Sequence, residues 1–214
     1  MLRVLILLIS LLATAYTKTP KFNPPNIHGT WQTQSQSVMT GPSFFQPDTE
    51  YLIEPHEPGL SYSFDLQTMT YETAQYLVYG NAQNHSCPSA QLIWHHGKLK
   101  IKPHLKKGYG KNGIDENEHQ LIIFLESIDH DSRQLVSDPC LDEGNSTYQR
   151  YKGNTKEVWS GIYKYDAYVD KWSLILYDEF GGTGRKVWMW LKSRDVEMLP
   201  RGRVTKKKKV YVDA

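Results

Sequence analysis

The residues whose chemistry can be named first are two cysteines and two asparagines in glycosylation sequons. Asn84 opens an Asn-His-Ser sequon directly before Cys87, and Asn145 opens an Asn-Ser-Thr sequon shortly after Cys140. Sequons have meaning only in a chain that meets the secretory glycosylation machinery, where cysteines also oxidise. We therefore predict glycans on both asparagines and a Cys87–Cys140 disulfide, which would stabilise the fold by about 4 kcal/mol. The alternative is two free buried thiols in a cytosolic domain.

The N-terminus predicts export from the cytosol. Arg3 is followed by the mainly apolar residues 4–12 and then by Ala13-Thr14-Ala15. These are the three parts of a secretory signal peptide, so we predict that residues 1–15 are a signal peptide cleaved after Ala15. A retained signal anchor is the alternative, but the apolar run is short for crossing about 30 Å of hydrocarbon. No later window is long and apolar enough for a span, and no terminal Lys-Asp-Glu-Leu type retrieval signal is present.

Charge is distributed unevenly along the chain. Residues 201–214 hold six bases and one acid, and we predict a basic mobile tail there, with a contact to anionic lipid as the alternative. Between the signal peptide and this tail, acids outnumber bases. That balance argues against nucleic acid as a partner.

The chain carries no familiar catalytic motif. Cys-x-x-Cys, His-Glu-x-x-His, Gly-x-Ser-x-Gly and a phosphate-binding glycine loop are all absent from the sequence. His95 and His96 are adjacent, and on a strand they would point to opposite faces, so they cannot share one metal ion. We predict no enzyme activity, no cofactor and no metal. Four carboxylates could still form a pair for glycoside hydrolysis, namely Glu54, Glu57, Asp65 and Glu72. The default expectation for each of them is a position on the surface.

Aromatic residues are dense, and core packing explains most of them. Tyr163 and Tyr165 recur two residues apart, as do Trp188 and Trp190, which places each pair on one face of a strand. We predict these four as an exposed apolar surface able to bind other proteins, with burial in the core as the alternative.

We expect strands to position these residues, because helical periodicity is almost absent from the sequence. The sequence shows instead short runs of β-branched and aromatic residues separated by Gly, Pro, Asn and Asp. The predicted strands are 29–38, 48–54, 60–66, 70–79, 90–96, 98–102, 119–126, 146–152, 157–165, 171–178 and 185–192. Ten or eleven strands at this spacing predict an all-β fold, an antiparallel barrel of lipocalin-like or related type with long irregular loops and one disulfide.

The connections between these strands also follow from the sequence. Leu66 to Thr70, His96-Gly97 and Tyr165 to Asp170 are predicted hairpin connections, and Gly181 to Gly184 a flexible one. Residues 103–118 are a predicted surface loop, and 127–145 a predicted irregular, disulfide-bearing connection. We expect an extended leader over 16–27 and a single domain over 28–200.

An ordered set of short motifs resembles a known family. The matching residues are Gly29-Thr30-Trp31, Thr40-Gly41-Pro42 with Phe45 and Pro47, Ile53-Glu54-Pro55, Pro58 to Phe64, Gly80-Asn81, Cys87-Pro88, His96-Gly97, Arg133-Gln134-Leu135, Ser137 to Cys140, Gly144, Ser146-Thr147-Tyr148 with Arg150-Tyr151, and Leu199-Pro200. Together they resemble the fungal Rot-one family (reversal of TOR lethality), over about 29–151 well and 152–200 loosely.

The resemblance implies a lumenal folding factor of the endoplasmic reticulum. Its partners would be partly folded secretory proteins and also the oligosaccharyltransferase or other glycosylation machinery. It also implies effects on β-1,6-glucan of the cell wall, on glycosylation and on lysis of autophagic bodies. Family members are held in the membrane by a hydrophobic C-terminal segment, whereas this sequence ends at Ala214 after a lysine run. We therefore expect either a lumenal protein retained through its partners or a sequence without its last exon.

Two other functions stay open at this point. Gly29-Thr30-Trp31 is reminiscent of the motif that opens lipocalins, which would make the protein a carrier of a small apolar ligand in a closed cavity. Aromatic side chains beside a carboxylate pair would instead make it a glucan-binding or glucan-modifying protein.

Overall fold

A computed structural model describes residues 25–103, 119–141, 143, 145–151, 154–178 and 184–205. The predicted signal peptide, most of the predicted leader, residues 104–118 of the predicted surface loop, Gly181 to Thr183 and residues 206–214 of the predicted tail lie outside the described residues.

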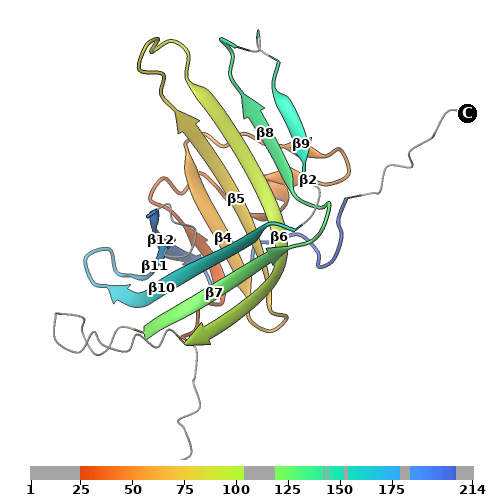
Figure 1. Ribbon diagram of the computed structural model, residues 1–214. Helices are drawn as coiled ribbons and strands as arrows, with labels where there is room; N and C mark the ends of the chain where they lie inside the picture. The colour runs from red at the N-terminus through yellow and green to blue at the C-terminus, as the bar shows by residue number, and fades with distance from the viewer. Residues whose placement is uncertain are drawn as a thin grey trace, which may run out of the picture.

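Eight antiparallel strands close into a barrel (Figure 1). Around the barrel they are β5 (Thr70–Tyr79), β4 (Gly59–Asp65), β1 (Gly29–Gln32), β12 (Lys186–Ser193), β11 (Lys171–Tyr177), β10 (Lys156–Asp166), β7 (His119–Ser127) and β6 (Ser89–Pro103). The pairing of β6 with β5 closes the ring. The predicted all-β antiparallel barrel is therefore confirmed.

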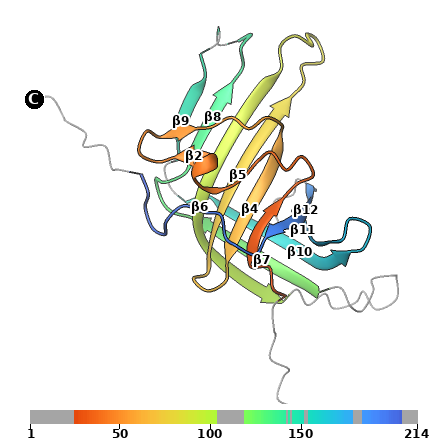
Figure 2. The same ribbon diagram turned by 180° about the vertical axis from the view of Figure 1, so that it is seen from behind.

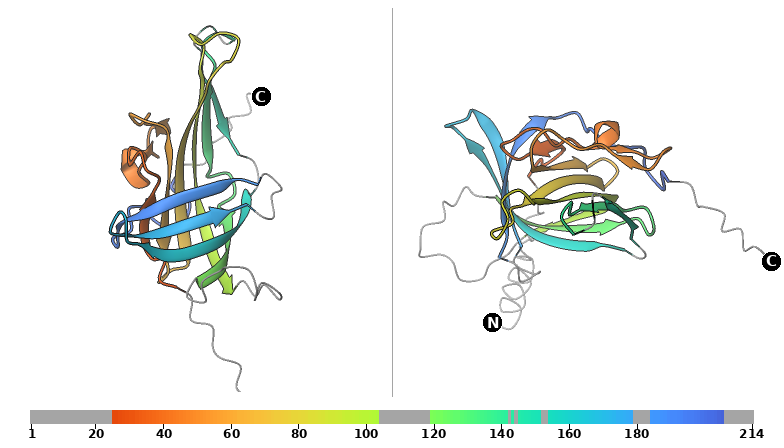
Figure 3. Two further views of the ribbon diagram at one scale, coloured as in Figure 1. Left: turned by 90° about the vertical axis from the view of Figure 1, so that its left-hand side faces the viewer. Right: turned by 90° about the horizontal axis from the view of Figure 1, so that it is seen from above.

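A sheet extension rises beyond the barrel, because β6 is long enough to pair with two partners on one side. Its second half pairs with β7, whereas residues 90–94 pair with β8 (Arg133–Ser137), which in turn pairs with β9 (Thr147–Arg150). Figure 3 shows this extension standing above the barrel. The prediction of an irregular segment over 127–145 was wrong at β8, a strand of only five residues flanked by turn-forming Asp and Pro.

The predicted break at His96-Gly97 was also wrong, because β6 runs unbroken through both residues. Gly97 pairs with Ser127 at the point where β7 replaces β8 as the neighbour of β6. A Cβ atom at Gly97 would collide with the carbonyl oxygen of Glu126. Glycine therefore permits a close approach of two strands here and does not mark a turn.

Large side chains fill the interior of the barrel. The Trp31 ring is fully buried and its Nε1 donates to the carbonyl oxygen of Ile27 at 2.8 Å. The cluster around it is formed by Ile27, Leu60, Tyr62, Phe64, Tyr71, Leu99, Leu121, Ile123, Leu125, Trp159, Tyr163, Leu174, Leu176 and Met189. An interior packed in this way opposes a lipocalin-like carrier, which needs an open cavity for its ligand.

A second apolar cluster, the outer core, lies on the outside of β5 and β6. It is covered by the segment that holds the 3-10 helix η1 (Gly41–Ser43), β2 (Phe45–Gln46) and β3 (Tyr51–Leu52), and by residues 194–205, called the strap (Figure 2). Its buried members are Val38, Phe44, Phe45, Leu52, Ala74, Tyr76, Leu92, Trp94 and Leu199. The strands predicted over 29–38 and 48–54 are shorter in the structure, because most of these residues leave the barrel to form this cover.

Glu72 ties the two covering segments to the barrel. Its fully buried carboxylate accepts hydrogen bonds from Gly41 N (2.5 Å), Trp94 Nε1 (2.9 Å) and Leu199 N (2.6 Å). Burial raises the pKa of Glu72, and these three donors oppose that rise. This carboxylate therefore has a structural role, joining η1, β6 and the strap.

Candidate functional site

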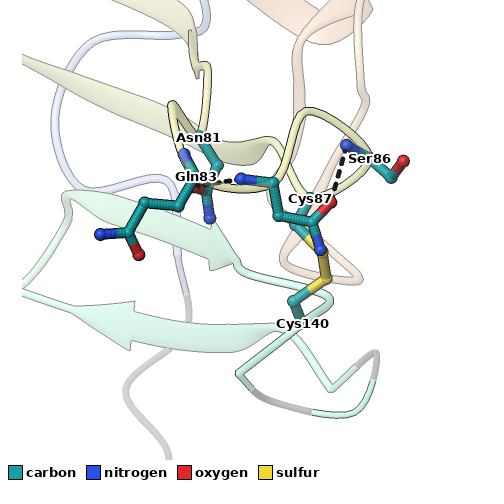
Figure 4. The surroundings of a disulfide bond; sticks show 6 residues. Asn81, Gln83, Ser86, Cys87 and Cys140 are labelled. Atoms are coloured by element: carbon teal, nitrogen blue, oxygen red, sulfur yellow. Dashed lines mark hydrogen bonds between the residues drawn. A yellow bond between two sulfur atoms is a disulfide. The ribbon is translucent and has the colours of Figure 1, made fainter.

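The disulfide stands at the tip of the sheet extension (Figure 4). It joins Cys87, in the connection between β5 and β6, to Cys140, in the connection between β8 and β9. Their Cα atoms are 5.8 Å apart across a sequence separation of 53 residues. The predicted pairing is confirmed, and it fastens the β8–β9 hairpin to the far end of β6.

Both sequon asparagines lie in these same two connections. Asn84 is exposed, its Oδ1 accepts from Ser86 N at 3.1 Å and its Nδ2 lies 3.3 Å from Cys87 Sγ. Asn145 is exposed just before β9. The tip thus presents both acceptor side chains to solvent, and glycans on them remain a prediction.

The four aromatic residues predicted as one surface lie on two faces of the β10–β11–β12 sheet. Trp188 and Trp190 pair with Ile175 and Ser173 and point away from the barrel axis, whereas Tyr163 and Tyr165 continue the inner face of β10. Trp188 and Tyr165 are 39% and 48% exposed, and Trp190 is half-buried.

Tyr163 corrects the prediction of exposure. It is only 7% exposed, because it belongs to the barrel core and its ring stacks on Trp172 at a centroid distance of 4.7 Å. Tyr165 lies two residues further along β10, beyond the core, and packs edge-on against the same indole at 5.4 Å.

The β10–β11 hairpin projects from the side of the barrel (Figure 1). Tyr168 at its turn is 96% exposed, Trp172 is 38% exposed and Val169 is 37% exposed. The sequence prediction left these three residues out of the surface. For Tyr168 and Val169 the predicted connection from Tyr165 to Asp170 was the available signal, since side chains in a hairpin turn face water. Trp172 lies on β11 and had no such signal.

On the outer face, Trp188 and Trp190 stand side by side along β12. Their ring centroids are 6.1 Å apart with planes inclined by 16°. The Nζ atoms of Lys186 and Lys164 lie 5.3 Å and 5.7 Å from the Trp188 ring centroid, within range of a cation–π attraction. This face is therefore apolar at its centre and basic around it.

A groove of about 620 Å³ borders this face. It runs between β12, the β10–β11 hairpin and the chain that follows β1, and Trp190 Nε1 donates to Asp166 Oδ2 at 3.3 Å within it. Its volume falls in the range of about 300–1,000 Å³ that is usual for ligand sites. Its lining includes Gln32, Gln34, Gln36, Tyr168, Trp188 and Trp190.

A polar cluster around Glu157 lies inside the barrel and is held together by hydrogen bonds. Glu157 lies 3.2 Å from His95 Nε2 and accepts from Tyr62 Oη (2.9 Å) and Trp159 Nε1 (3.0 Å). Burial alone would raise the pKa of Glu157, but His95 and these two hydrogen bonds lower it to about 2. Because this carboxyl stays ionised near neutral pH, it cannot serve there as a general acid.

The histidines and carboxylates that the sequence offered for catalysis or metal binding each have separate structural partners. His95 faces the barrel interior while His96 bonds Asp131 on the outside, as strand alternation predicts. Glu54 accepts from Tyr76, Asp65 pairs with Arg201, and Glu72 lies under the strap. Within the described ranges, no three His, Cys, Asp or Glu side chains gather closely enough to hold a metal ion.

In the part of the chain that the structure describes, no helix has the length and apolarity needed to cross a bilayer.

Comparison with known proteins gives consistent matches. Residues 27–211 match the model of the Rot1 family, described as a fungal chaperone for protein folding within the endoplasmic reticulum. Protein ROT1 of Saccharomyces cerevisiae is 42% identical over 177 residues, covering 82% of this chain and 60% of that protein. Protein ROT1 of Candida glabrata is 40% identical, covering 80% and 58%. Protein ROT1 of Lodderomyces elongisporus is 38% identical, covering 94% and 70%.

The chain spans about 60% of the length of the first relatives it matches. No solved structure matches it.

Proposed function

This chain belongs to the Rot1 family of fungal chaperones for protein folding within the endoplasmic reticulum, and we propose that it acts as such a chaperone by binding partly folded secretory proteins. The observation that carries the proposal is an aromatic patch on the outer face of β12 and at the turn between β10 and β11. We define this patch as Tyr168, Trp188 and Trp190, whose side chains are exposed or half-buried and line one groove.

Exposed aromatic side chains suit a chaperone for a physical reason. Partly folded proteins expose apolar side chains that aggregate with one another, and a folded protein that covers them transiently lowers the concentration of aggregating species. Large aromatic side chains provide much apolar contact area at a low cost in side-chain entropy. A barrel with a filled interior keeps these side chains on its surface instead of burying them in its own core.

Removal of the two indole side chains of the patch should weaken the binding of unfolded clients. A Trp188→Ser/Trp190→Ser variant should bind unfolded clients at least about thirtyfold more weakly, because loss of a central aromatic anchor costs about 2 kcal/mol or more. The readout is light scattering from reduced, aggregating lysozyme as chaperone concentration is increased. Tyr51→Ser is the matched control, because Tyr51 is 60% exposed but lies on β3. Equal suppression by the double variant and the wild type would rule out the patch as the client surface.

We propose further that Asn84 and Asn145 carry N-linked glycans, since both are exposed at the tip. Endoglycosidase treatment of the protein produced in the secretory pathway should lower its mass by that of two glycans. Asn84→Gln and Asn145→Gln should each lower the mass by that of one glycan. Asn154→Gln is the control, because Asn154 is exposed but begins no sequon. A mass that endoglycosidase leaves unchanged contradicts the proposal.

A further inference from the structure

Lysines gather on one outer face of the barrel. This face, called the lysine face, consists of the outward side chains of the second half of β6 and of β7, β10, β11 and β12. Among the described residues of these strands, every charged side chain that points outward is a lysine except Glu126 and Asp166. In the sequence between the signal peptide and the tail, by contrast, acids outnumber bases. The lysine face is therefore a basic region on a mildly acidic domain.

Strand register places apolar side chains along the middle of this face. Phe124 on β7 pairs with Lys100 on β6 and with Val158 on β10, so these three side chains form one row across the sheet. Phe124 and Val158 belong to an apolar strip of exposed or half-buried side chains. Its other members are Ile122, Ile162, Tyr177, Trp188 and Trp190. The two indoles of the aromatic patch are thus one end of a longer apolar strip.

Exposed lysines border the apolar strip on two sides. They are Lys98, Lys100 and Lys102 on β6, and Lys171, Lys186 and Lys192 on β11 and β12. Lys102 Nζ lies 5.2 Å from the Phe124 ring centroid, and Lys186 Nζ lies 5.5 Å from that of Tyr177. Cation–π attraction holds these two ammonium groups beside the apolar surface. An anionic group that meets them therefore belongs to a ligand that can also cover the strip.

The lysine face is grooved and wide enough for a short length of chain. The groove of about 620 Å³ lies at its β12 end, and a second groove of about 500 Å³ lies over β6, β7 and β10. Four strand spacings of about 4.8 Å separate β6 from β12, a width of about 19 Å that about six residues of extended polypeptide would cover. Grooves receive the side chains of a polypeptide, whereas a membrane surface contacts side chains that protrude.

We propose that the lysine face selects clients by charge, binding unfolded segments in which a few apolar residues are flanked by aspartate or glutamate. The apolar residues cover the strip, and the flanking carboxylates meet the lysines of β6 on one side and of β12 on the other. This inference rests on the proposed chaperone function and names the class of client segment. Complementary charge speeds encounter with such segments, and like charge disfavours basic ones.

The test compares three peptides that share an apolar centre and differ in their flanks. The centre alternates phenylalanine and serine, and it is flanked on both sides by two aspartates, two serines or two lysines. Anisotropy of an uncharged fluorophore on each peptide reports binding to the full chain. At about 50 mM salt the aspartate-flanked peptide should bind about fivefold more tightly than the serine-flanked one, and the lysine-flanked one most weakly. At about 0.5 M salt these differences should fall below about twofold, because salt screens exposed charges.

Variants on the two lysine borders locate the effect. Lys100→Gln/Lys186→Gln should lower the advantage of the aspartate-flanked peptide from about fivefold to about twofold and leave the affinity for the serine-flanked peptide unchanged. Both lysines are exposed, so this variant should keep the circular dichroism of the wild-type protein. Arg201→Gln/Arg203→Gln is the matched control, because it removes the same charge from the strap and should leave the advantage at about fivefold.

Whole proteins should show the same preference. Lysozyme is basic and α-lactalbumin is acidic, although the two share one fold. Suppression of aggregation after reduction should therefore require less of the wild-type protein for α-lactalbumin than for lysozyme.

The outcomes separate this inference from the chaperone function. Equal affinity for the three peptides, with the aggregation of both clients suppressed equally, overturns selection by charge and leaves the chaperone function standing. Displacement of the aspartate-flanked peptide by vesicles of equal parts phosphatidylcholine and phosphatidylserine assigns the face to a membrane surface and also overturns it. Failure of the wild-type protein to bind any peptide or to suppress the aggregation of either client refutes the chaperone function and, with it, this inference.

Discussion

Replacing Cys87 and Cys140 together by alanine is expected to lower the free energy of unfolding by about 4 kcal/mol. The bond links residues 53 apart in sequence, and the loop it closes contains β6, β7 and β8. In the chain-entropy model, cutting this link gives the unfolded chain more conformations while the folded barrel keeps its strand pairs. The expected cost is a large part of the stability of a typical domain.

Urea unfolding of the variant, followed by tryptophan fluorescence, measures this loss as a lower midpoint. Hydrogen exchange should locate its first effect in β8 and β9, because β9 is the last strand of the extension and the bond fastens this hairpin to the tip. Dithiothreitol reduces the disulfide, so the wild-type protein treated with it should have a urea midpoint close to that of the variant. An unchanged midpoint in both would mean that the extension is held by its strand pairing alone.

The barrel class could be read from the sequence because alternation and turn residues are local properties. Lys98 to Lys102 alternate between apolar and basic, and this run is the second half of β6. The breaks were harder to place, since a glycine permits both a turn and a close approach of strands. Gly97 serves the close approach, and only the position of β7 decides between the two.

The candidate site was predictable only in part, because the exposure of a side chain depends on residues from neighbouring strands. Two cysteines in an exported chain have one possible intramolecular pairing, so the disulfide followed directly. Spacing put Tyr163 and Tyr165 on one face of a strand, but it could not say where the barrel core ends between them. That boundary depends on Trp172, which comes from the neighbouring strand and stacks on Tyr163.

Buried polar groups were the least predictable, because their partners come from distant parts of the chain. Glu72 looked like one of several surface carboxylates, yet it accepts hydrogen bonds from η1, β6 and the strap. Asp131, in the turn before β8, binds the end of the same strap. Two buried carboxylates thus hold the strap over the outer core, and each offers acceptors to backbone N–H groups that the barrel cannot satisfy.

Asp131 should therefore be among the least replaceable side chains in the protein. It is fully buried, it lies 2.8 Å from His96 Nε2, and it accepts from Val204 N (2.8 Å), Thr205 N (3.1 Å) and the Thr205 hydroxyl. Asp131→Ala is expected to lower the free energy of unfolding by about 3–5 kcal/mol, because it leaves these donors buried without an acceptor. Urea unfolding at neutral pH measures this change.

The same carboxylate predicts an acid-dependent loss of stability. Burial alone would raise the pKa of Asp131, but hydrogen bonds from His96, Thr205 and Val204 lower it from 3.8 to about 2. Since the folded pKa lies below the unfolded value, this contribution of about 2 kcal/mol is complete above about pH 5 and is lost as the pH falls through about 2. Asp131→Asn should lack this component, so its stability should fall less steeply over that interval. Asp129→Asn is the control, because Asp129 is a half-exposed neighbour. If the Asp131→Asn and wild-type profiles run parallel below pH 4, the charge on Asp131 does not hold the strap.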